Sequence, residues 1–157
     1  PEFIVQLFDQ KLVQPHQICF EITETALINA LTSATYLIER LRSIGCSFAI
    51  DDFGSSLSTF SILKKLKVDF IKIDGNYVRD VCDDAIDCSM VESINEMAHI
   101  LGVQTIAECV DSEAIIQVLR RIGVNYAQGF YLGNPVPMNN ISTLKEIHAE
   151  SELILVN

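Results

Sequence analysis

The stretch FAIDDFGSS, residues 48–56, joins a short apolar run to two consecutive carboxylates and a glycine. The apolar run is typical of a buried strand, and successive side chains of a strand point to opposite faces. Asp51 and Asp52 therefore cannot both lie on an ordinary solvated face. The stretch predicts a buried strand whose C-terminal end presents carboxylates to a site.

The alternation of an apolar strand with a helix recurs along the chain. Strands are predicted at 18–23, 47–51, 68–74, 103–109 and 125–132, the third of them buried on both faces. Helices are predicted at 1–11, 31–44, 57–66, 85–101, 112–122 and 139–150, with Gly45, Gly102 and Gly123 at three helix ends. The tail LILVN, residues 153–157, is left unassigned.

Five strand–helix units without a Pro- or Ser-rich linker predict an α/β protein with a parallel sheet. A closed eight-unit barrel takes about 250 residues. The chain has 157 residues, so we expect a partial TIM-like (β/α)8 barrel that lacks its N-terminal strands. An open doubly wound sheet is the alternative, but no glycine-rich phosphate loop follows any predicted strand.

The composition excludes several classes of function. The formal charge of −10 disfavours coating of DNA or RNA by a basic patch, and a phosphate ester would need divalent cations beside this chain. No apolar run approaches the roughly 18 residues of a membrane span, so we expect no membrane segment in this chain. The five cysteines form no CxxC pair and the three histidines are isolated, which disfavours zinc and favours a reducing cytoplasm.

Polar side chains stand at or just past the predicted end of every strand. In chain order they are Glu21 and Glu24, Asp51 and Asp52, Lys72 and Asp74, Glu108 and Asp111, and Gln128. The carboxyl ends of barrel strands open onto one face, where these acids would repel one another unless a cation held them. Oxygen ligands favour Mg²⁺ or Mn²⁺, and a pair of such ions suits phosphoester hydrolysis. For any single acid the alternative is a helix cap or an ion pair, and Asp111 is a clear candidate for a cap.

Lys72 lies in the middle of a predicted buried strand, where an ammonium group needs partners. Beside metal ions it could accept a proton from a water molecule and so act as a catalytic base. A structural ion pair with Asp51 or Glu108 is the alternative. The residues alone leave both interpretations open.

The segments FEITET, IDDFG, VDFIKID, AECV and QGFYLGNPVP occur in this order over nearly the whole chain. This pattern resembles the EAL family of cyclic di-GMP phosphodiesterases. The resemblance implies a (β/α)8 barrel that cleaves one phosphodiester of cyclic di-GMP with two Mg²⁺ or Mn²⁺ ions, giving linear pGpG. It also implies that residues 1–157 are the C-terminal portion of one EAL-type domain of a longer protein, which other domains could anchor to a membrane.

The same resemblance assigns roles to individual residues. It implies carboxylate ligands for the two ions, with Asp51 bridging them, at Glu21, Asp51, Asp52, Asp74 and Glu108. Lys72 would activate the attacking water, and Glu108 and Gln128 would complete the catalytic set. Gln128 would also contact the substrate, and Glu24 would steady the loop after IDDFG.

The chain departs from the family pattern at several positions. The Glu-Ala-Leu motif is absent, residues 55–59 read SSLST instead of a sequence like TGYSS, Cys109 replaces a glycine, and Asp111 replaces a glutamate. These departures support the alternative of a degenerate domain that binds cyclic di-GMP or docks a partner without turnover. The isolated chain is expected to be weak or inactive and to form a homo-oligomer or pair with the missing N-terminal part through open strand edges.

Overall fold

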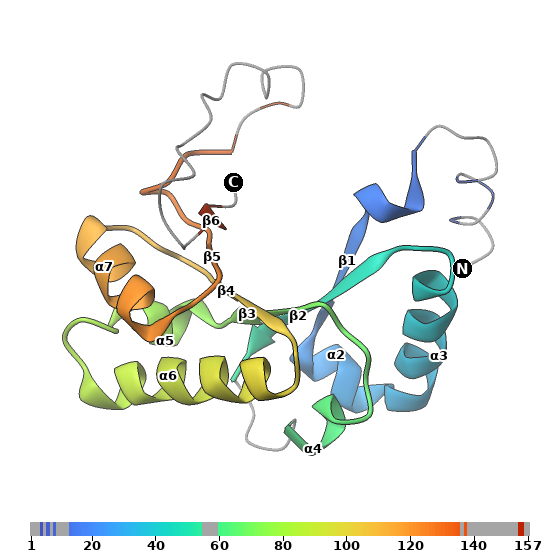
Figure 1. The fold of residues 1–157 in the computed structure, drawn as a ribbon, viewed down its shortest axis with the longest axis horizontal. Helices are drawn as coiled ribbons and strands as arrows, with labels where there is room; N and C mark the ends of the chain where they lie inside the picture. The colour runs from blue at the N-terminus through green and yellow to red at the C-terminus, as the bar shows by residue number, and fades with distance from the viewer. Residues whose placement is uncertain are drawn as a thin grey trace. The chain divides into compact units, whose positions relative to one another are not determined.

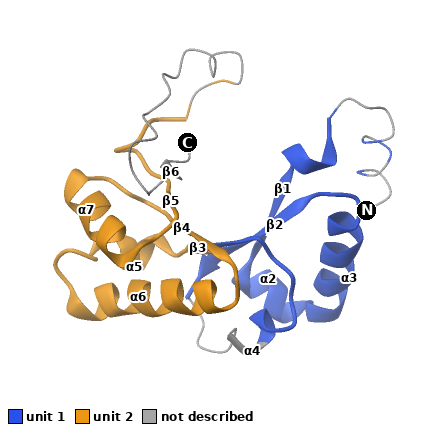
Figure 2. Ribbon diagram, in the orientation of Figure 1, with its two compact units in different colours: residues 1–71 blue, residues 72–157 orange. Residues whose placement is uncertain are grey.

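The computed structural model describes residues 13–54 and 60–135, together with residues 4, 6, 8, 137, 154 and 155. The chain forms two compact units, Pro1–Ile71 (unit 1) and Lys72–Asn157 (unit 2), and the boundary falls inside strand β3, Phe70–Ile73 (Figure 2). The helices expected at 1–11 and 139–150 fall largely outside the described residues, as does the loop at 55–59. None of the helices in the described part of the chain has the length and apolar character needed to cross a bilayer.

Unit 1 is built on two parallel strands, β1 (Cys19–Thr23) and β2 (Ser47–Phe53) (Figure 1). Helix α3 (Leu31–Arg42) connects them and buries Ala34, Ile38 and Leu41, while β2 buries its apolar run. A short 3₁₀ helix, η1 (Pro15–Gln17), precedes β1, helix α2 (Glu24–Asn29) follows it, and helix α4 is Phe60–Leu63. The connection between parallel strands is therefore helical, as parallel pairing requires.

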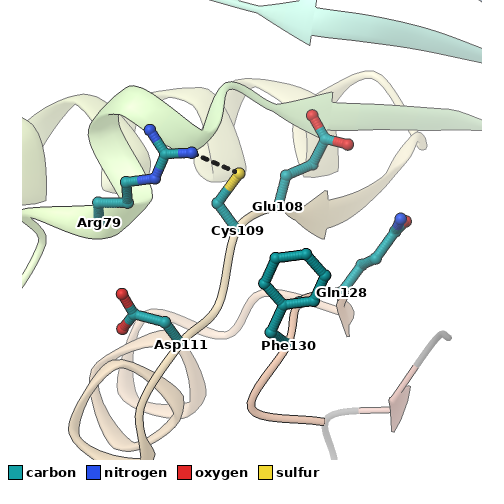
Figure 3. Close-up of a pocket in the computed structure, with 7 residues that line it drawn as sticks. Arg79, Glu108, Cys109, Asp111, Gln128 and Phe130 are labelled. Carbon is teal, nitrogen blue, oxygen red and sulfur yellow. Dashed lines mark hydrogen bonds between the residues drawn. The ribbon is translucent and has the colours of Figure 1, made fainter. Parts of the chain in front are cut away.

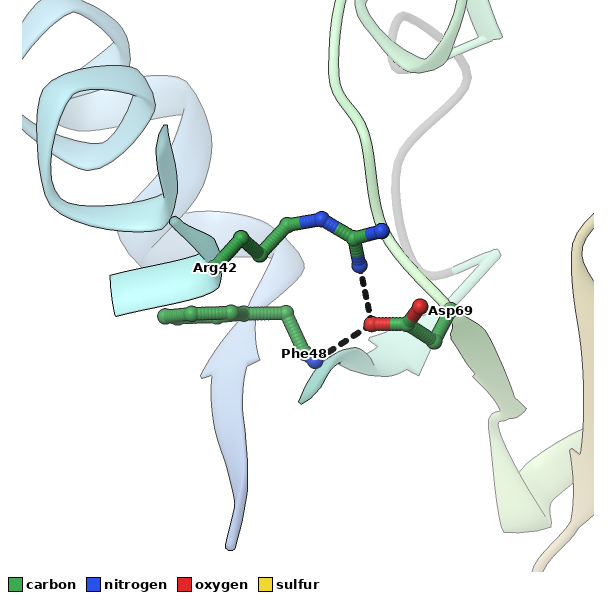
Figure 4. A network of polar contacts seen from close by, with 3 residues as sticks. All are labelled: Arg42, Phe48 and Asp69. Carbon is green, nitrogen blue, oxygen red and sulfur yellow. Dashed lines mark hydrogen bonds and ion pairs between the residues drawn. The ribbon is translucent and has the colours of Figure 1, made fainter. Parts of the chain in front are cut away.

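A polar contact ties three segments of unit 1 together (Figure 4). The Asp69 carboxylate accepts a hydrogen bond from the backbone N–H of Phe48 at 2.8 Å and pairs with the Arg42 guanidinium. The backbone N–H of Asp69 in turn donates to the carbonyl of Phe48 at 2.9 Å. These bonds hold the segment before β3 against the beginning of β2 and the last turn of α3.

Unit 2 contains the helices α5 (Gly75–Arg79), α6 (Ala85–Ile100) and α7 (Glu113–Ile122), shown in Figure 1. Its strands β4 (Gln104–Ala107), β5 (Tyr126–Ala127) and β6 (Ile154–Leu155) pair in parallel in that order. Helix α7 buries Ile115, Ile116 and Leu119 and ends at Gly123, whose φ of 85° is a left-handed conformation that glycine adopts without strain.

The expected α/β class with parallel strands is confirmed, and β1 to β4 lie where the apolar runs predicted them. The strand expected at 125–132 is wrong in its extent, because β5 ends at Ala127 and the backbone then turns, with Leu132 N–H donating to the carbonyl of Gly129. Helices α2 and α5 were not expected. Each begins at a side-chain cap, from Thr23 and Asp74 respectively, which offers the backbone a helical start directly after a strand.

Candidate functional site

Asp51 and Asp52 lie inside β2, where Asp51 is half-buried and Asp52 is exposed. Asp52 has a φ of 54°, a left-handed conformation that few residues other than glycine adopt, although aspartate tolerates it better than most. The normal alternation of side chains is therefore interrupted at Asp52, and Phe53 beyond it is buried. Such backbone outliers concentrate at functional sites, so this position is a candidate on geometry as well as on charge.

Glu21 shares a face of the strand pair with Asp51. The register pairs Glu21 with Ala49 and Thr23 with Asp51, and residues two apart on a strand point the same way. Glu21 is exposed and lies in the middle of β1, two residues before the strand end at which the sequence placed it. The structure thus groups two of the predicted ligands within unit 1.

Glu24 begins helix α2 and is completely buried. Its Oε2 accepts a hydrogen bond of 3.1 Å from the backbone N–H of Gly54, and Gly54 has a φ of 107°. A carboxylate in the first turn of a helix also interacts favourably with the helix dipole. This contact fixes the residue that ends the IDDFG stretch, directly before the undescribed residues 55–59.

Lys72 forms a buried ion pair in unit 2. Its Nζ lies 2.9 Å from Oε1 of Glu108, and the two side chains are 6% and 16% exposed. Each charge at such a site needs the other, because an isolated buried charge is strongly unfavourable. Glu108 is one of the two salt-bridge partners that the sequence suggested for Lys72.

Asp74 lies just after β3 and caps helix α5. Its Oδ1 accepts a hydrogen bond of 2.8 Å from the backbone N–H of Asn76. The sequence offered a helix cap as the alternative role of Asp111. The structure does not give it that role, because the N-cap of α7 is Ser112. Asp111 is exposed and lines a pocket instead.

Gln128 follows β5 and is held beside the end of β4 by backbone hydrogen bonds. Its N–H donates to Ala107 at 2.8 Å, and its carbonyl accepts from Val110 at 3.0 Å. The next residue must be glycine, because a Cβ on Gly129 would lie 2.7 Å from the carbonyl carbon of Val110. This close approach of two backbones places Gln128 next to the residues that follow β4.

A pocket of about 280 Å³ in unit 2 collects several of these side chains (Figure 3). It is lined by Arg79, Glu108, Cys109, Asp111, Gln128, Gly129 and Phe130. Sequence reasoning missed Arg79, which projects from α5, and Phe130, an aromatic ring left 74% exposed. Arg79 follows Asp74 by five residues, and only the tertiary contacts of α5 distinguish it from a surface arginine.

The turn after Gln128 is hydrogen-bonded to Glu113 of helix α7. The Glu113 carboxylate accepts hydrogen bonds from the Gln117 amide and from the Tyr131 hydroxyl, the latter at 2.9 Å. These two donors lower the pKa of Glu113, and the same carboxylate raises the pKa of Tyr131. The turn that follows Gln128 and contains Phe130 is thereby held against the first turn of α7.

Comparison with known proteins shows which family the chain resembles. The model of the EAL domain matches residues 1–135. The cyclic di-GMP phosphodiesterase PdeB of Shewanella oneidensis is 41% identical over 133 residues, which are 85% of this chain and 15% of the relative. PdeF of Escherichia coli, also named a cyclic di-GMP phosphodiesterase, is 33% identical over 147 residues, which are 94% of this chain and 19% of the relative. The chain thus spans less than a fifth of the length of these relatives.

Solved structures agree with the sequence relatives. The EAL domain of Mycobacterium smegmatis DcpA superposes with a TM-score of 0.83 at 31% identity, over 91% of this chain and 64% of that one. The PaMucR phosphodiesterase in complex with c-di-GMP gives a TM-score of 0.82 at 29% identity, over 88% of this chain and 56% of that one. Klebsiella pneumoniae BlrP1, in a manganese and cyclic di-GMP complex, gives 0.79 at 31% identity, over 86% and 35% of the two chains. These structures are TIM-barrel-like, so the sheet of this chain is part of such a fold.

Proposed function

The chain belongs to the EAL domain family, and from this premise we propose that residues 1–157 form the C-terminal portion of a domain that hydrolyses cyclic di-GMP to linear pGpG. The observation that carries the proposal is the buried ion pair of Lys72 with Glu108, beside a pocket that Gln128 also lines. The names of the relatives and the cyclic di-GMP complexes of the structural neighbours support the choice of substrate.

Five carboxylates would hold two Mg²⁺ or Mn²⁺ ions, namely those of Glu21, Asp51, Asp52, Asp74 and Glu108. The donor set fits this chemistry because every ligand is a hard oxygen atom. The net charge of −10 adds a second argument, since an anionic substrate needs positive charge that this chain does not itself supply. When bound, the ions would neutralise charge on the phosphodiester and orient it.

Lys72, as the neutral amine, would accept the proton of the attacking water and so become an ammonium. The water oxygen would form a bond to phosphorus while the bond from phosphorus to the 3′ oxygen breaks, and the leaving oxygen would take a proton from solvent to become the 3′ hydroxyl of pGpG. Glu108 Oε1 lies 2.9 Å from Lys72 Nζ and would direct this amine toward the water, while Gln128 would orient water and substrate from the end of β5. Glu24 would steady the loop after IDDFG through its bond to Gly54.

The test is hydrolysis of cyclic di-GMP by the complete polypeptide that carries this chain, with Mn²⁺ or Mg²⁺ and chromatography of pGpG. Lys72→Ala is expected to lower kcat at least about 100-fold, because it removes the general base. Lys65→Ala removes an exposed lysine in the same chain and serves as the matched control. Equal rates for Lys72→Ala and Lys65→Ala would contradict the proposal.

A second candidate is a receptor or docking module that binds cyclic di-GMP without turnover. The backbone at Cys109 favours it, since φ there is 56° at a position where the family pattern has glycine. Equilibrium dialysis separates the two functions: a receptor retains cyclic di-GMP and releases no pGpG.

Self-association as a homo-oligomer, or pairing with further strands of the barrel, belongs to the same proposal. So does a cytoplasmic setting, which the five free cysteines in the described part of the chain support. Sedimentation velocity at micromolar concentration tests the association directly, and a clean monomer would contradict it.

A further inference from the structure

Cys109 directly follows Glu108 and has a left-handed backbone conformation that contacts from neighbouring residues support. Its φ of 56° is unusual for a residue with a side chain, so its surroundings must hold it there. Two contacts do so, and both come from helix α5. Arg79 Nη2 donates a hydrogen bond of 3.3 Å to the Cys109 sulfur, and Figure 3 shows the sulfur pointing toward the guanidinium while the Glu108 carboxylate points away from it.

The second contact is with Gly75, the first residue of α5. A Cβ placed on Gly75 would lie 2.7 Å from the Cβ of Cys109 and closer still to its sulfur. No real Cβ tolerates such an approach, so the thiol occupies the space that any other residue at position 75 would need. The side chain of Cys109 and the missing side chain of Gly75 are therefore complementary.

We propose that Cys109 is a positioning residue for Glu108, acting as an interlocking pair with Gly75. Glu108 and Cys109 are consecutive, so the backbone angles at Cys109 set how the chain leaves β4 after Glu108. With the thiol seated between Gly75 and Arg79, the Glu108 carboxylate is directed at Lys72, 2.9 Å away. The inference rests on the proposed role of Glu108 as a metal ligand and adds a partner that the family pattern, with glycine at position 109, does not contain.

The test is a double-mutant cycle of Gly75→Ala and Cys109→Gly in the complete polypeptide. Mn²⁺ affinity is measured by electron paramagnetic resonance of the free ion, without substrate. Each single variant is expected to raise the Mn²⁺ Kd about tenfold, the usual effect of losing support behind a metal ligand. Gly75→Ala displaces the thiol, whereas Cys109→Gly frees the backbone after Glu108.

The Mn²⁺ Kd of the double variant distinguishes coupled from independent effects. Because the Cβ added by Gly75→Ala clashes only with the Cys109 side chain, this substitution is expected to add nothing in the Cys109→Gly background. Independent effects would instead multiply to about 100-fold in the double variant. Equal effects of Gly75→Ala in both backgrounds would overturn the interlock and would point to the neighbouring cap Asp74 instead. Gly102→Ala controls for a general loss of stability, since a Cβ there meets nothing within 4 Å but is strained by the φ of 72°; it is expected to lower the Tm and to leave the Mn²⁺ Kd unchanged.

Catalysis gives a second readout. Gly75→Ala is expected to lower kcat about 10- to 100-fold with the KM for cyclic di-GMP nearly constant, because the change affects the direction of one ligand. A loss of thermal stability with unchanged Mn²⁺ affinity and kcat would overturn the positioning role. If Gly75→Ala alone does not fold, the Mn²⁺ Kd of Cys109→Gly decides, and an unchanged value overturns the proposal.

The two proposals fail in different ways. If the wild-type protein neither hydrolyses nor binds cyclic di-GMP while the coupling in Mn²⁺ affinity persists, the proposed function is wrong and the positioning role stands. If the wild-type protein makes pGpG but the two substitutions have independent effects, the positioning role is wrong and the function stands.

Discussion

Asp69 makes a hydrogen bond and an ion pair, and the two contribute differently to the free energy of unfolding. The bond from the backbone N–H of Phe48 is short and satisfies a donor at the buried beginning of β2, while the ion pair with Arg42 joins side chains that are each 30% exposed. Hydrogen bonds to a charged group contribute more than exposed ion pairs, because solvent and salt screen the latter.

We therefore expect Asp69→Ala to lower the free energy of unfolding by about 2 kcal/mol, since it leaves the Phe48 N–H without its acceptor. Arg42→Met, which removes only the ion pair, is expected to cost less than about 1 kcal/mol. Urea unfolding of the two variants measures both values. Equal losses would mean that the ion pair, and not the backbone bond, holds the segment before β3.

At the scale of elements, the turn after β5 depends on helix α7. Glu113 is exposed in the first turn of α7, and its pKa is lowered by the Gln117 amide and then by the Tyr131 hydroxyl. An acid whose folded pKa is depressed stabilises the fold above its unfolded pKa, and this contribution is lost as the pH falls through the folded pKa. The attachment of the turn is therefore expected to weaken in acid.

Tyr131→Phe removes one of the two donors, so the pKa of Glu113 is expected to rise toward its ordinary value. Gln117→Ala is expected to raise the pKa of Glu113 more than Tyr131→Phe does, because the Gln117 hydrogen bond lowers that pKa most. Carboxyl-detected NMR titration measures the pKa in each variant. Tyr126→Phe, whose hydroxyl bonds to Gln104 instead, is the matched control, and a shift of the Glu113 pKa equal to that of Tyr131→Phe would argue against the turn contact.

At the scale of the whole molecule, charge is the dominant property. With 21 acidic against 11 basic residues, the folded chain repels itself and any anionic ligand unless cations bind. If the proposed carboxylates hold Mn²⁺, binding stabilises the native state by mass action, by about 2.7 kcal/mol per site at 100 times the Kd.

Removal of divalent ions with EDTA is thus expected to lower the Tm and to abolish binding of cyclic di-GMP, and Mn²⁺ is expected to restore both. Differential scanning calorimetry and equilibrium dialysis give the two readouts. Sodium chloride at matched ionic strength controls for general screening of the negative charge. Stabilisation by the sodium salt equal to that by Mn²⁺ would contradict specific metal sites.

The amino-acid sequence alone predicted β1 to β4 and the helices α3, α6 and α7, together with the parallel α/β class and the family. These follow from local patterns: apolar runs mark β1 to β4, and Gly102 and Gly123 stand where α6 and α7 end. The burial of the strand that contains Lys72 could also be predicted, because apolar residues flank the lysine on both sides. The candidate site residues were proposed from the same patterns and from the family motif.

How those residues are held depends on tertiary contacts. The left-handed backbone at Asp52, the hydrogen bond from Gly54 to Glu24 and the ion pair of Lys72 with Glu108 cannot be read from local propensity. The contacts in question join residues about 30 or more positions apart, such as Gly54 with Glu24 and Arg79 with Cys109. Local propensity governs which element forms, whereas the direction of a buried side chain is set by the segments that pack against it.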